Sequence, residues 1–508
     1  MQKKIISLEE ISTCLSPLRG EGKRIVHCHG VFDLLHPGHI HHFREAKAQG
    51  DTLVVSITPD RFVNKGPGRP AFNELLRLET LAALKDIDFV VLNNAPDAIS
   101  AIECIKPHVY IKGSEYREHN KDITGKISQE AAAVESCGGQ IYYTNDDVVF
   151  SSSTLLNRHF DPPSEEVLHF MQHMKSKYQA NDLLSFIDSL KGLKVLVVGD
   201  AIIDSYQYVS PLGQSGKGLH MTARLLEKEL FLGGSLIIAN HLAEFVDNVT
   251  LLTAVAHNCP YRSFMDNTLN PKVETAFLET DLDMTLCKKR YVLQEGKHFT
   301  KLFETYSTTD PILSDSAAEE VASYIRDEAS GYDLVLVADF GNGFTNNTII
   351  DALSGVETFL AINAQTNSGN RGYNVVTHYK RADFISVNEA ELRLAAHDRV
   401  SSLSTVLERI ATKLSCPSIS ITRGVNGVLC HDISGDLTIP AFTTSIVDRV
   451  GAGDSYFALA SLLLASGAPL DVAGFIGSLA ASMNVQVVGN KESASKSALS
   501  KYLVRLMK

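Results

Sequence analysis

Two glycine-containing segments, near opposite ends of the chain, limit most strongly what this sequence can fold into. The first, Gly30–His39, reads Gly-Val-Phe-Asp-Leu-Leu-His-Pro-Gly-His, and the second, Asp448–Asp454, reads Asp-Arg-Val-Gly-Ala-Gly-Asp. Each precedes a predicted helix, and a helix N-terminus offers free backbone amides and a positive dipole end to a phosphate. The sequence therefore predicts two separate phosphate sites and suggests two consecutive reactions on one chain.

Length and composition narrow the class of protein. A chain of 508 residues is longer than a domain with a single hydrophobic core usually is, so we expect two to four domains. The net charge of −12 argues against nucleic-acid binding, which needs clustered basic side chains. No apolar run approaches the ~20 residues that span a bilayer, and the N-terminus shows no secretory signal. Eight scattered cysteines without a C-x-x-C pair favour free thiols, and we expect a cytoplasmic protein without a membrane partner.

The first 160 residues carry the pattern of a nucleotide-binding α/β domain. From Arg24 an apolar strand, a glycine-containing turn, a helix and a second strand at 52–57 form a βαβ unit. Further strands are predicted at 89–92, 109–111 and 140–143, with helices at 74–84 and 128–136. We therefore predict a first domain over residues 1–160.

A second, larger domain follows a break at Pro162 and Pro163. Residues 161–190 are polar and helical in pattern, and we interpret them as a connector. A new sheet begins at 194–200, and strands at 334–338 and 418–422 alternate with helices. The sequence predicts an α/β layer structure over residues 191–508.

The first candidate site centres on two histidines. His36 and His39 are three residues apart where a strand gives way to a helix, and Pro37 suits the first helical turn. Two imidazoles there can stabilise the charge that builds on an α-phosphate under attack. Gly30 lets the backbone approach a nucleotide, and Lys65, on the turn-rich loop 64–70, can close over a triphosphate.

The segment Gly30–His39 resembles the H-x-G-H motif of the cytidylyltransferase-like nucleotidyltransferases, and the likeness continues through 65–70, 111–116 and 150–154. It is most similar to the transferase half of the bifunctional ADP-heptose synthases. The lead-in 148–150 lacks the Arg of glycerol-phosphate cytidylyltransferases, which argues against a glycerol-phosphate substrate. The resemblance implies a Rossmann-like fold, phosphate binding by His36 and His39, and a triphosphate contact from Lys65. The nucleotide contacts that it implies are Gly30, Phe32, Asp33, Lys112, Gly113, Ser151, Ser152, Ser153 and Thr154.

The second candidate site has the parts that phosphoryl transfer needs. Gly451, Ala452 and Gly453 place amides at a helix N-terminus, and Asp454 lies in the first turn. The amides can hold a transferring phosphoryl group while the carboxylate takes a hydroxyl proton.

The segment Asp448–Asp454 resembles the D-T-x-G-A-G-D signature of the ribokinase-like (PfkB) sugar kinases, with Arg449 where Thr is usual. The resemblance implies a three-layer α/β/α fold with a small β lid, Asp454 as general base and Gly451–Gly453 as anion hole. It places Asn388 and Glu391 near Mg²⁺ and the phosphates, with Glu391 holding the metal through water. It also assigns Thr422, Gly424 and Gly427 to the ATP site, and Asp204, Gly233, Gly234 and Asn240 to the sugar.

The acceptor side departs from the heptose-phosphate kinases. Their G-G-A-A-N segment is replaced by Gly233–Asn240, which delays the Ala-Asn pair by three residues, and the segment 362–365 lacks the carboxylate and cation of a D-P-K-like stretch. The acceptor can therefore differ from heptose 7-phosphate. The segment Gly213–Gly218 looks like a phosphate loop, but Gly218 stands where a Mg²⁺-binding Ser or Thr is needed, so we expect it in the lid.

These features predict a bifunctional enzyme with the transferase before the kinase, the reverse of the common fused order. The kinase would use ATP and Mg²⁺ on a sugar or sugar phosphate, and the transferase would join a sugar 1-phosphate to a nucleotide from ATP or CTP, as in ADP-heptose synthesis. The expected partners are sugar phosphates and nucleoside triphosphates, with a homodimer left open. The alternatives are a CTP-dependent enzyme for another sugar or polyol phosphate, and a non-catalytic sensor of nucleotide or sugar.

Overall fold

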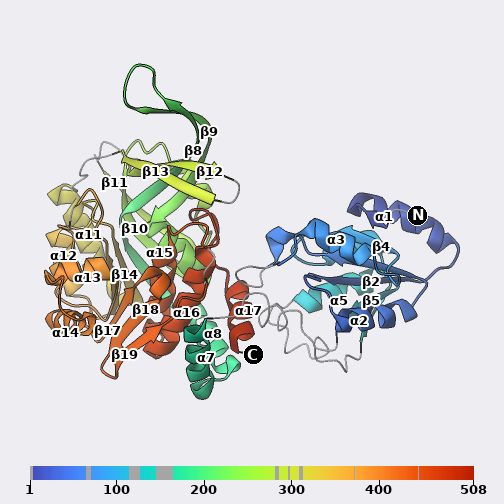
Figure 1. Ribbon diagram of the computed structural model, residues 1–508. Coiled ribbons are helices and arrows are strands. Elements are labelled where there is room, and N and C mark those ends of the chain that lie inside the picture. Colours follow the sequence, from blue (N-terminus) through green and yellow to red (C-terminus); the bar gives the residue numbers. More distant parts are fainter. Residues whose placement is uncertain are drawn as a thin grey trace. The chain divides into compact units, whose positions relative to one another are not determined.

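The computed structural model divides into two compact units, Met1–Ser164 with Ser500–Arg505, and Glu165–Leu499 with Leu506–Lys508 (Figure 1). The structure describes residues 4–63, 70–113, 126–144, 164–280, 285–295, 298–307, 313–370, 372–443 and 446–507. Within these ranges no helix combines the length and hydropathy that crossing a membrane requires.

The first unit is built on a six-stranded, fully parallel sheet with the order β1-β4-β3-β2-β5-β6. Its strands are β1 (Ile5–Ile6), β2 (Ile25–Gly30), β3 (Thr52–Ile57), β4 (Phe89–Leu92), β5 (Val109–Lys112) and β6 (Gln140–Tyr143). From β2 the chain adds β3 and β4 on one side, and later β5 and β6 on the other. This reversal opens a crevice at the carboxyl ends of β2 and β5, where open α/β sheets bind ligands.

Helices cover both faces of this sheet. They are α1 (Leu8–Gly20), α2 (Pro37–Ala48), α3 (Glu74–Ala82), α4 (Ile99–Ile105) and α5 (Lys126–Ser136). Val26 and Val55 pack with Phe43 of α2 on one face, whereas Ile25 and Val54 pack with α1 and α4 on the other. Since β3 is buried on both faces, it appears in the sequence as a continuous apolar run. The strands predicted at 52–57, 89–92 and 140–143 are confirmed, and the one at 109–111 extends by one residue.

The second unit is a three-layer α/β/α structure. Its nine-stranded sheet has the order β11-β10-β7-β14-β15-β16-β17-β18-β19, and all its strands run parallel except β18, which pairs antiparallel with β17 and β19. The strands are β7 (Lys194–Gly199), β10 (Asn248–Ala256), β11 (Val273–Thr280), β14 (Leu334–Asp339), β15 (Phe359–Ala364), β16 (Phe384–Asn388), β17 (Ser418–Thr422), β18 (Val428–Asp432) and β19 (Gly435–Ile439).

One layer of helices packs on each face of this sheet (Figure 1). The first layer contains α11 (Asp315–Glu328), α12 (Asn347–Ser354), α13 (Glu389–Ala396) and α14 (Leu403–Lys413). The second contains α9 (Ser235–Ala243), α15 (Ala452–Ala465) and α16 (Leu470–Asn484). Outside these layers lie α7 (Glu165–Lys177), α8 (Ala180–Ser189), α10 (Arg262–Thr268) and α17 (Lys496–Met507). The 3₁₀ turns are η1 (Asp60–Phe62) in the first unit, and η4 (Leu190–Gly192), η5 (Ala329–Gly331), η6 (Val376–His378) and η7 (Gly424–Asn426) in the second.

A separate four-stranded sheet, called the lid here, has the order β13-β12-β8-β9. It consists of β8 (Ala201–Gln214), β9 (Met221–Gly234), β12 (Cys287–Glu295) and β13 (His298–Tyr306). The hairpin of β8 and β9 projects from the second unit (Figure 1). Because Gly213–Gly218 runs from the end of β8 into the turn of this hairpin, it is part of the lid and lacks the strand–loop–helix setting of a phosphate loop.

The helices α7 and α8 lie in the range predicted as a connector, and they belong to the second unit. Phe170 of α7 packs against Phe475 of α16, with ring centroids 5.6 Å apart, and against Phe442 at 6.0 Å. This aromatic cluster fixes α7 on the second unit.

Candidate active sites

The structure brings His36 and His39 together at the N-terminus of α2. His36 is the N-cap residue, and its Nδ1 accepts a hydrogen bond from the Gly38 amide at 3.2 Å. Pro37 occupies the first helical position, where its fixed φ favours helix initiation. The centroids of the two imidazole rings are 4.0 Å apart. An anion at this helix end would therefore meet both rings and the positive end of the helix dipole.

Gly30 and Phe32 form one packing unit beside these histidines. Phe32 has a left-handed φ of +46°, which turns its ring back beneath Gly30. A Cβ on Gly30 would lie 3.0 Å from that ring. The Phe32 ring also contacts His39 edge-on, with a centroid distance of 5.5 Å. The glycine is thus needed for the ring that supports His39.

Two charged side chains organise the chain around the first site. Asp33 is buried and accepts hydrogen bonds from the amides of Ala71 and Phe72, both at 3.0 Å. Arg77, whose side chain is fully buried, donates to the carbonyls of Val31 (2.6 Å) and Thr58 (2.9 Å). Arg77 was missed in the sequence because nothing in its local pattern distinguishes it from an exposed helical arginine.

Lys112 ends β5 at the same crevice. Its Nζ lies 2.7 Å from a carboxylate oxygen of Glu130, and Tyr110 donates to that oxygen at 3.2 Å. Register pairs Cys28 of β2 with Ile111 of β5, so Lys112 at the end of β5 and Gly113 just after it lie beside the end of β2 at Gly30. Lys65 and Ser151–Thr154 lie outside the described residues.

A chain of hydrogen bonds beneath the first site was not predicted. His27 Nε2 lies 2.7 Å from Ser56 Oγ, which lies 2.8 Å from His29 Nδ1, and His29 Nε2 lies 3.2 Å from Thr58 Oγ1. Burial lowers the pKa of His27 to about 3, so this imidazole is neutral. The chain fixes the ring of His29 at the carboxyl end of β2.

The second site forms at the N-terminus of α15. Gly451 has φ +83°, and a Cβ there would lie 1.8 Å from Asn490 Oδ1, so the position requires glycine. Asp454 lies in the first turn, is buried, and accepts a long hydrogen bond of 3.4 Å from Gln365 Nε2. Burial, together with the nearby charge of Asp204, raises the pKa of Asp454 to about 7. A carboxyl group tuned to this range can take up a proton near neutral pH.

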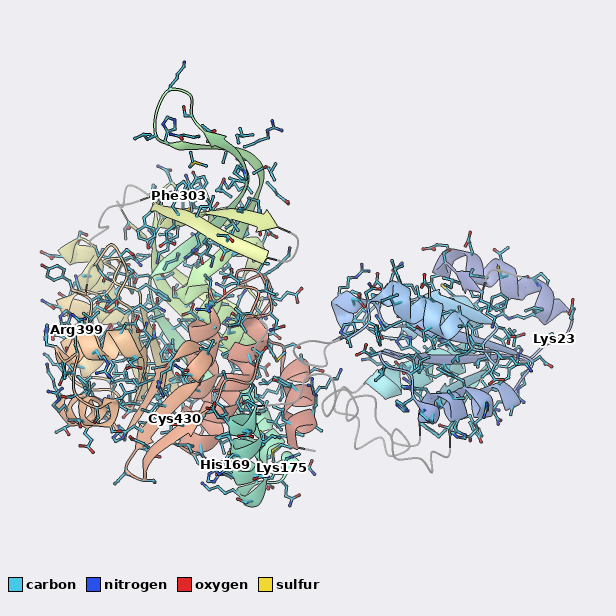
Figure 2. All side chains as sticks on the ribbon, viewed as in Figure 1. Lys23, His169, Lys175, Phe303, Arg399 and Cys430 are labelled. Atoms are coloured by element: carbon cyan, nitrogen blue, oxygen red, sulfur yellow. The ribbon has the colours of Figure 1, made fainter. Side chains whose placement is uncertain are left out.

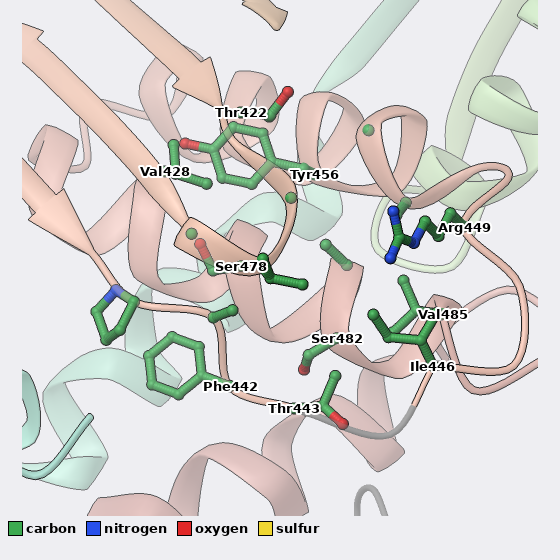
Figure 3. Close-up of a pocket in the computed structure, with 18 residues that line it drawn as sticks. Thr422, Val428, Phe442, Thr443, Ile446, Arg449, Tyr456, Ser478, Ser482 and Val485 are labelled. Carbon is green, nitrogen blue, oxygen red and sulfur yellow. The ribbon is translucent and has the colours of Figure 1, made fainter. Parts of the chain in front are cut away.

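A pocket of about 240 Å³ adjoins this helix end (Figure 3). Five residues predicted from the sequence line it together, namely Thr422, Gly424, Gly427, Ala452 and Gly453. Phe442, Tyr456 and Val485 add apolar walls that the sequence did not indicate. An apolar pocket that leads to a row of free amides suits a nucleoside with its phosphates.

Asn388 and Glu391 cap α13 reciprocally. Asn388 Oδ1 accepts from the Glu391 amide at 2.9 Å, and Glu391 Oε2 accepts from the Asn388 amide at 2.8 Å. Glu391 Oε1 accepts a further hydrogen bond from Thr366 at 3.2 Å. Burial raises the pKa of Glu391 to about 7. In the part of the chain that the structure describes, no group of three His, Cys, Asp or Glu side chains forms a metal cluster.

Asp204 and the paired glycines meet on the acceptor side. A Cβ on Gly233 would lie 2.9 Å from Asp204 Oδ2, and Gly234 has a left-handed φ of +59°. Asp204 forms an ion pair with Arg290 of β12, which also lies 3.2 Å from Glu304. Arg290 was not predicted, because only the pairing of β12 with β8 brings it to Asp204.

Asn240 has different partners. Its Nδ2 donates to the carbonyl of Thr268 at 3.1 Å, and its Oδ1 accepts from the Asn270 amide at 2.8 Å. The side chain therefore holds the end of α10, and these bonds do not support the predicted contact with the sugar.

The lid is tied to the glycine segment through Asp448. Its carboxylate accepts from Tyr206 of β8 (2.5 Å), from Lys301 of β13 (2.6 Å) and from the Gly489 amide (3.0 Å). Although burial acts to raise the pKa of Asp448, the hydrogen bonds from Lys301 and Tyr206 lower it below its ordinary value. The ionised carboxylate thus links two lid strands to the start of α15.

Family models match both sites. Residues 27–158 match the model of cytidylyltransferase-like proteins, and residues 374–497 match that of the pfkB family carbohydrate kinases. The chain joins a cytidylyltransferase-like domain to a PfkB-like kinase domain. The first range contains His36 and His39, and the second contains Asn388 and Asp454. The predicted families and their order along the chain are confirmed.

Two bifunctional proteins are similar to a part of the chain. The chain is 41% identical over 138 residues to the bifunctional protein HldE of Methylococcus capsulatus, covering 27% of this chain and 28% of the relative. It is 38% identical over 153 residues to bifunctional protein HldE of Methylobacillus flagellatus, covering 30% of each. The match thus spans less than a third of these relatives.

A solved structure confirms the fold of the kinase-like part. The phosphofructokinase-2 of Escherichia coli, crystallised with fructose-6-phosphate, superposes with a TM-score of 0.50 at 14% identity, covering 62% of this chain and 100% of that one. The three-layer ribokinase-like architecture predicted for the second domain is therefore confirmed.

Proposed function

We propose that this chain is a bifunctional enzyme of nucleotide-sugar synthesis. The second unit phosphorylates a sugar or sugar phosphate with ATP, and the first transfers a nucleotidyl group to a sugar 1-phosphate with release of pyrophosphate. The main support is the buried Asp454 in the first turn of α15, beside a pocket lined by Thr422, Gly424 and Gly427. The two matched families and the HldE relatives support the pairing of activities.

In the kinase step, the Asp454 carboxylate takes the proton of the acceptor hydroxyl. The acceptor oxygen forms a bond to the γ-phosphorus while the bond to the ADP oxygen breaks. The amides of Gly451, Ala452 and Gly453 stabilise the charge on the transferring group. The pocket holds the nucleoside and excludes water from it.

Mg²⁺ is the metal that such a step would use, and the residues fit it. Both oxygens of Glu391 accept backbone amides, which leaves lone pairs for a metal-bound water. Since Mg²⁺ keeps several waters and is bound largely by substrate phosphates, one carboxylate at this position suffices. The ion would neutralise charge on the β- and γ-phosphates, with Asn388 alongside.

In the transferase step, an oxygen of the sugar 1-phosphate attacks the α-phosphorus, and pyrophosphate leaves. His36, His39 and the first amides of α2 stabilise the charge that develops there. Lys65, Lys112, Gly113 and Ser151–Thr154 are proposed to contact the nucleotide. ATP and CTP both fit this scheme, because the groups named here act on the phosphates and not on the base.

The product would be an NDP-sugar such as ADP-heptose. A second candidate is a kinase fused to a CTP-dependent transferase for another sugar or polyol phosphate. It is favoured by Gln365, whose amide contacts Asp454 where relatives carry a D-P-K-like segment, and by the hydrogen bond of Asn240 of α9 to the end of α10.

We place both reactions in the cytoplasm, where nucleoside triphosphates are supplied. The hairpin of β8 and β9 exposes Leu212, Leu219, Met221, Leu225 and Leu226, and β13 exposes Phe303 (Figure 2). Exposed apolar side chains on these strands of the lid support pairing of two chains through their lids.

The deciding experiment offers ATP with heptose 7-phosphates, hexose phosphates and free sugars, and then offers the product to each nucleoside triphosphate. Phosphorylation of heptose 7-phosphate, followed after dephosphorylation by ADP-sugar formation, would establish the heptose route. Turnover of another acceptor with CTP would establish the second candidate. Nucleotide binding without any turnover would contradict both and indicate a sensor.

A further inference from the structure

Four side chains beneath the first site form a hydrogen-bond row that the proposed transferase steps do not use. His27 Nε2 lies 2.7 Å from Ser56 Oγ, and Ser56 Oγ lies 2.8 Å from His29 Nδ1. His29 Nε2 in turn lies 3.2 Å from Thr58 Oγ1. The row starts in the interior, where His27 and Ser56 are fully buried, and ends at Thr58, directly after β3. Its hydrogen bonds have a direction, which decides what the Thr58 hydroxyl can do.

The buried end of the row shows which atoms donate. In the part of the chain that the structure describes, His27 Nδ1 is buried and has no hydrogen-bond partner. Because burial lowers the pKa of His27 to about 3, the imidazole is neutral and carries one N–H. A proton on Nδ1 would leave a buried donor unpaired, which native proteins tolerate less often than an unpaired acceptor. The proton is therefore on Nε2, and His27 donates to Ser56.

The direction of this first hydrogen bond sets the direction of the others. Since Ser56 Oγ accepts from His27, its own proton is donated to Nδ1 of His29. An imidazole that accepts at Nδ1 carries its proton on Nε2, so His29 donates to Thr58 Oγ1. Thr58 Oγ1 is thus an acceptor in the row, and its own proton is left for another partner. Hydrogen bonds in a row polarise one another, which makes this hydroxyl a stronger donor.

Thr58 lies beside the segment that the nucleotide is expected to approach. Its amide donates to the carbonyl of Gly30 at 3.1 Å, and its carbonyl accepts from Arg77 at 2.9 Å. The carboxylates nearby in the sequence have donors already, because Asp60 accepts from Arg77 at 2.6 Å and Asp33 accepts from two backbone amides. Among the described residues, no protein group accepts the Thr58 proton. A ligand can supply the acceptor, and anionic phosphate oxygens form the stronger hydrogen bonds.

We propose that the Thr58 hydroxyl donates a hydrogen bond to a phosphate oxygen in the transferase site, carried either by the nucleotide or by the sugar 1-phosphate. Ser56, His29 and His27 are positioning residues that keep its proton directed at the ligand. This inference rests on the proposed transferase function. The Thr58 O–H bond stays intact in the reaction: the sugar phosphate oxygen forms the bond to the α-phosphorus, and the bond to pyrophosphate breaks.

Substitution of Thr58 tests the contact on the full-length chain. Thr58→Val removes the hydroxyl and keeps the shape of the side chain, whereas Thr58→Ser keeps the hydroxyl. Thr52→Val is the matched control, because Thr52 is equally buried and lies at the opposite end of β3. Contact with the nucleotide predicts that Thr58→Val weakens ATP or CTP binding, measured by calorimetry, at least about fivefold. Contact with the sugar 1-phosphate predicts instead a KM for that substrate raised at least about fivefold, with nucleotide affinity unchanged. Thr58→Ser should restore most of either loss.

A double-mutant cycle tests whether the row acts through Thr58. Ser56→Ala breaks the row without touching Thr58, and it should weaken the same binding step about threefold in the wild-type background. The loss should vanish in the Thr58→Val background, where no hydroxyl is left to direct. An equal loss in both backgrounds would show a merely structural role and overturn the positioning part of the proposal. ¹⁵N NMR of the histidine rings, assigned with His27→Gln, should find the His27 proton on Nε2, and a proton on Nδ1 would overturn the direction of the row.

The outcomes separate this proposal from the proposed function. If the chain transfers nucleotides and Thr58→Val behaves like Thr52→Val, the phosphate contact is wrong and the transferase function stands. If the chain joins no sugar 1-phosphate to any nucleotide, but Thr58→Val weakens nucleotide binding, the transferase function is wrong and the contact stands. Thermal unfolding of every variant separates these results from misfolding.

Discussion

The carboxyl group of Asp454 should make the kinase activity depend on pH near neutrality. Its pKa of about 7 in the folded chain lies above the ordinary 3.8, so the ionised base is lost as the pH falls through 7. We expect kcat/KM to fall about tenfold for each pH unit below 7. A pH–rate profile measures this. A rate that is constant from pH 5.5 to 8 would show that Asp454 is not the base.

Replacement of the same group should separate activity from stability. Asp454→Asn is expected to lower kcat by about 10²- to 10⁴-fold, the usual contribution of a general base. Because the folded chain binds more protons than the unfolded chain between pH 3.8 and 7, this carboxyl group lowers stability as the pH rises across that interval. The variant should therefore melt at or above the wild-type temperature at pH 8, with a smaller difference at pH 5. Asp315→Asn, in the exposed first turn of α11, is the control and should change neither quantity.

The site residues differ in how far the sequence could reveal them. Asp454, Gly451 and His36 lie in short patterns whose local geometry follows from helix starts, so they could be located without a structure. Arg77 and Arg290 could not, because tertiary packing of strands and loops buries them while their neighbours in sequence look like ordinary exposed segments. Asn240 shows the converse. Its position in the sequence suggested a contact with the sugar, but its side chain is hydrogen-bonded to Asn270, thirty residues further along the chain, just after α10.

The start of α15 should tolerate a methyl group at one glycine and reject it at another. A Cβ at position 451 would overlap Asn490, and an alanine there would have to keep φ +83°. A Cβ at Gly453 meets nothing within 4 Å. Gly451→Ala is expected to lower kinase kcat at least about 100-fold by displacing the amides of the anion hole. Gly453→Ala should fold normally and retain a far larger share of the activity. Equal losses of kinase activity in the two variants would contradict this difference between the two positions.

The loop that leads into α3 should depend on Arg77 for its stability. Removal of this buried guanidinium leaves the carbonyls of Val31 and Thr58 and the carboxylate of Asp60 without their donor. Arg77→Met is expected to destabilise the first unit by about 3 kcal/mol. Chemical unfolding followed by a probe in that unit measures this value. The exposed Arg61→Met is the control, and a similar effect of both substitutions would contradict the structural role of Arg77.

The elements themselves were largely predictable where a buried parallel strand produces an apolar run, as in β3 and β14. The helices α7 and α8 were interpreted as a connector because their polar faces dominate the pattern, whereas Phe170 attaches them to the second unit. The length of the β8–β9 hairpin could not be inferred, since its exposed leucines do not follow the alternation of a half-buried strand.

The two activities should be separable on one chain, because each unit has its own core and its own helix N-terminus. His39→Ala is expected to lower nucleotidyl transfer at least about 100-fold and to leave the kinase rate within about twofold. Asp454→Asn should do the opposite. Both reactions assayed on each variant test this, and a loss of kinase activity in His39→Ala would show that the units depend on each other.

The ring of Phe32 beneath Gly30 has a consequence for engineering nucleotide preference. A Cβ at residue 30 would press on the Phe32 ring at 3.0 Å, so a library that varies residue 30 alone should return glycine most often, whatever base is selected for. Paired libraries in which residue 32 shrinks as residue 30 grows would explore sequences that single-site searches never reach. The edge contact of Phe32 with His39 means that such pairs would also adjust the orientation of the imidazole, and selectivity and rate would change together.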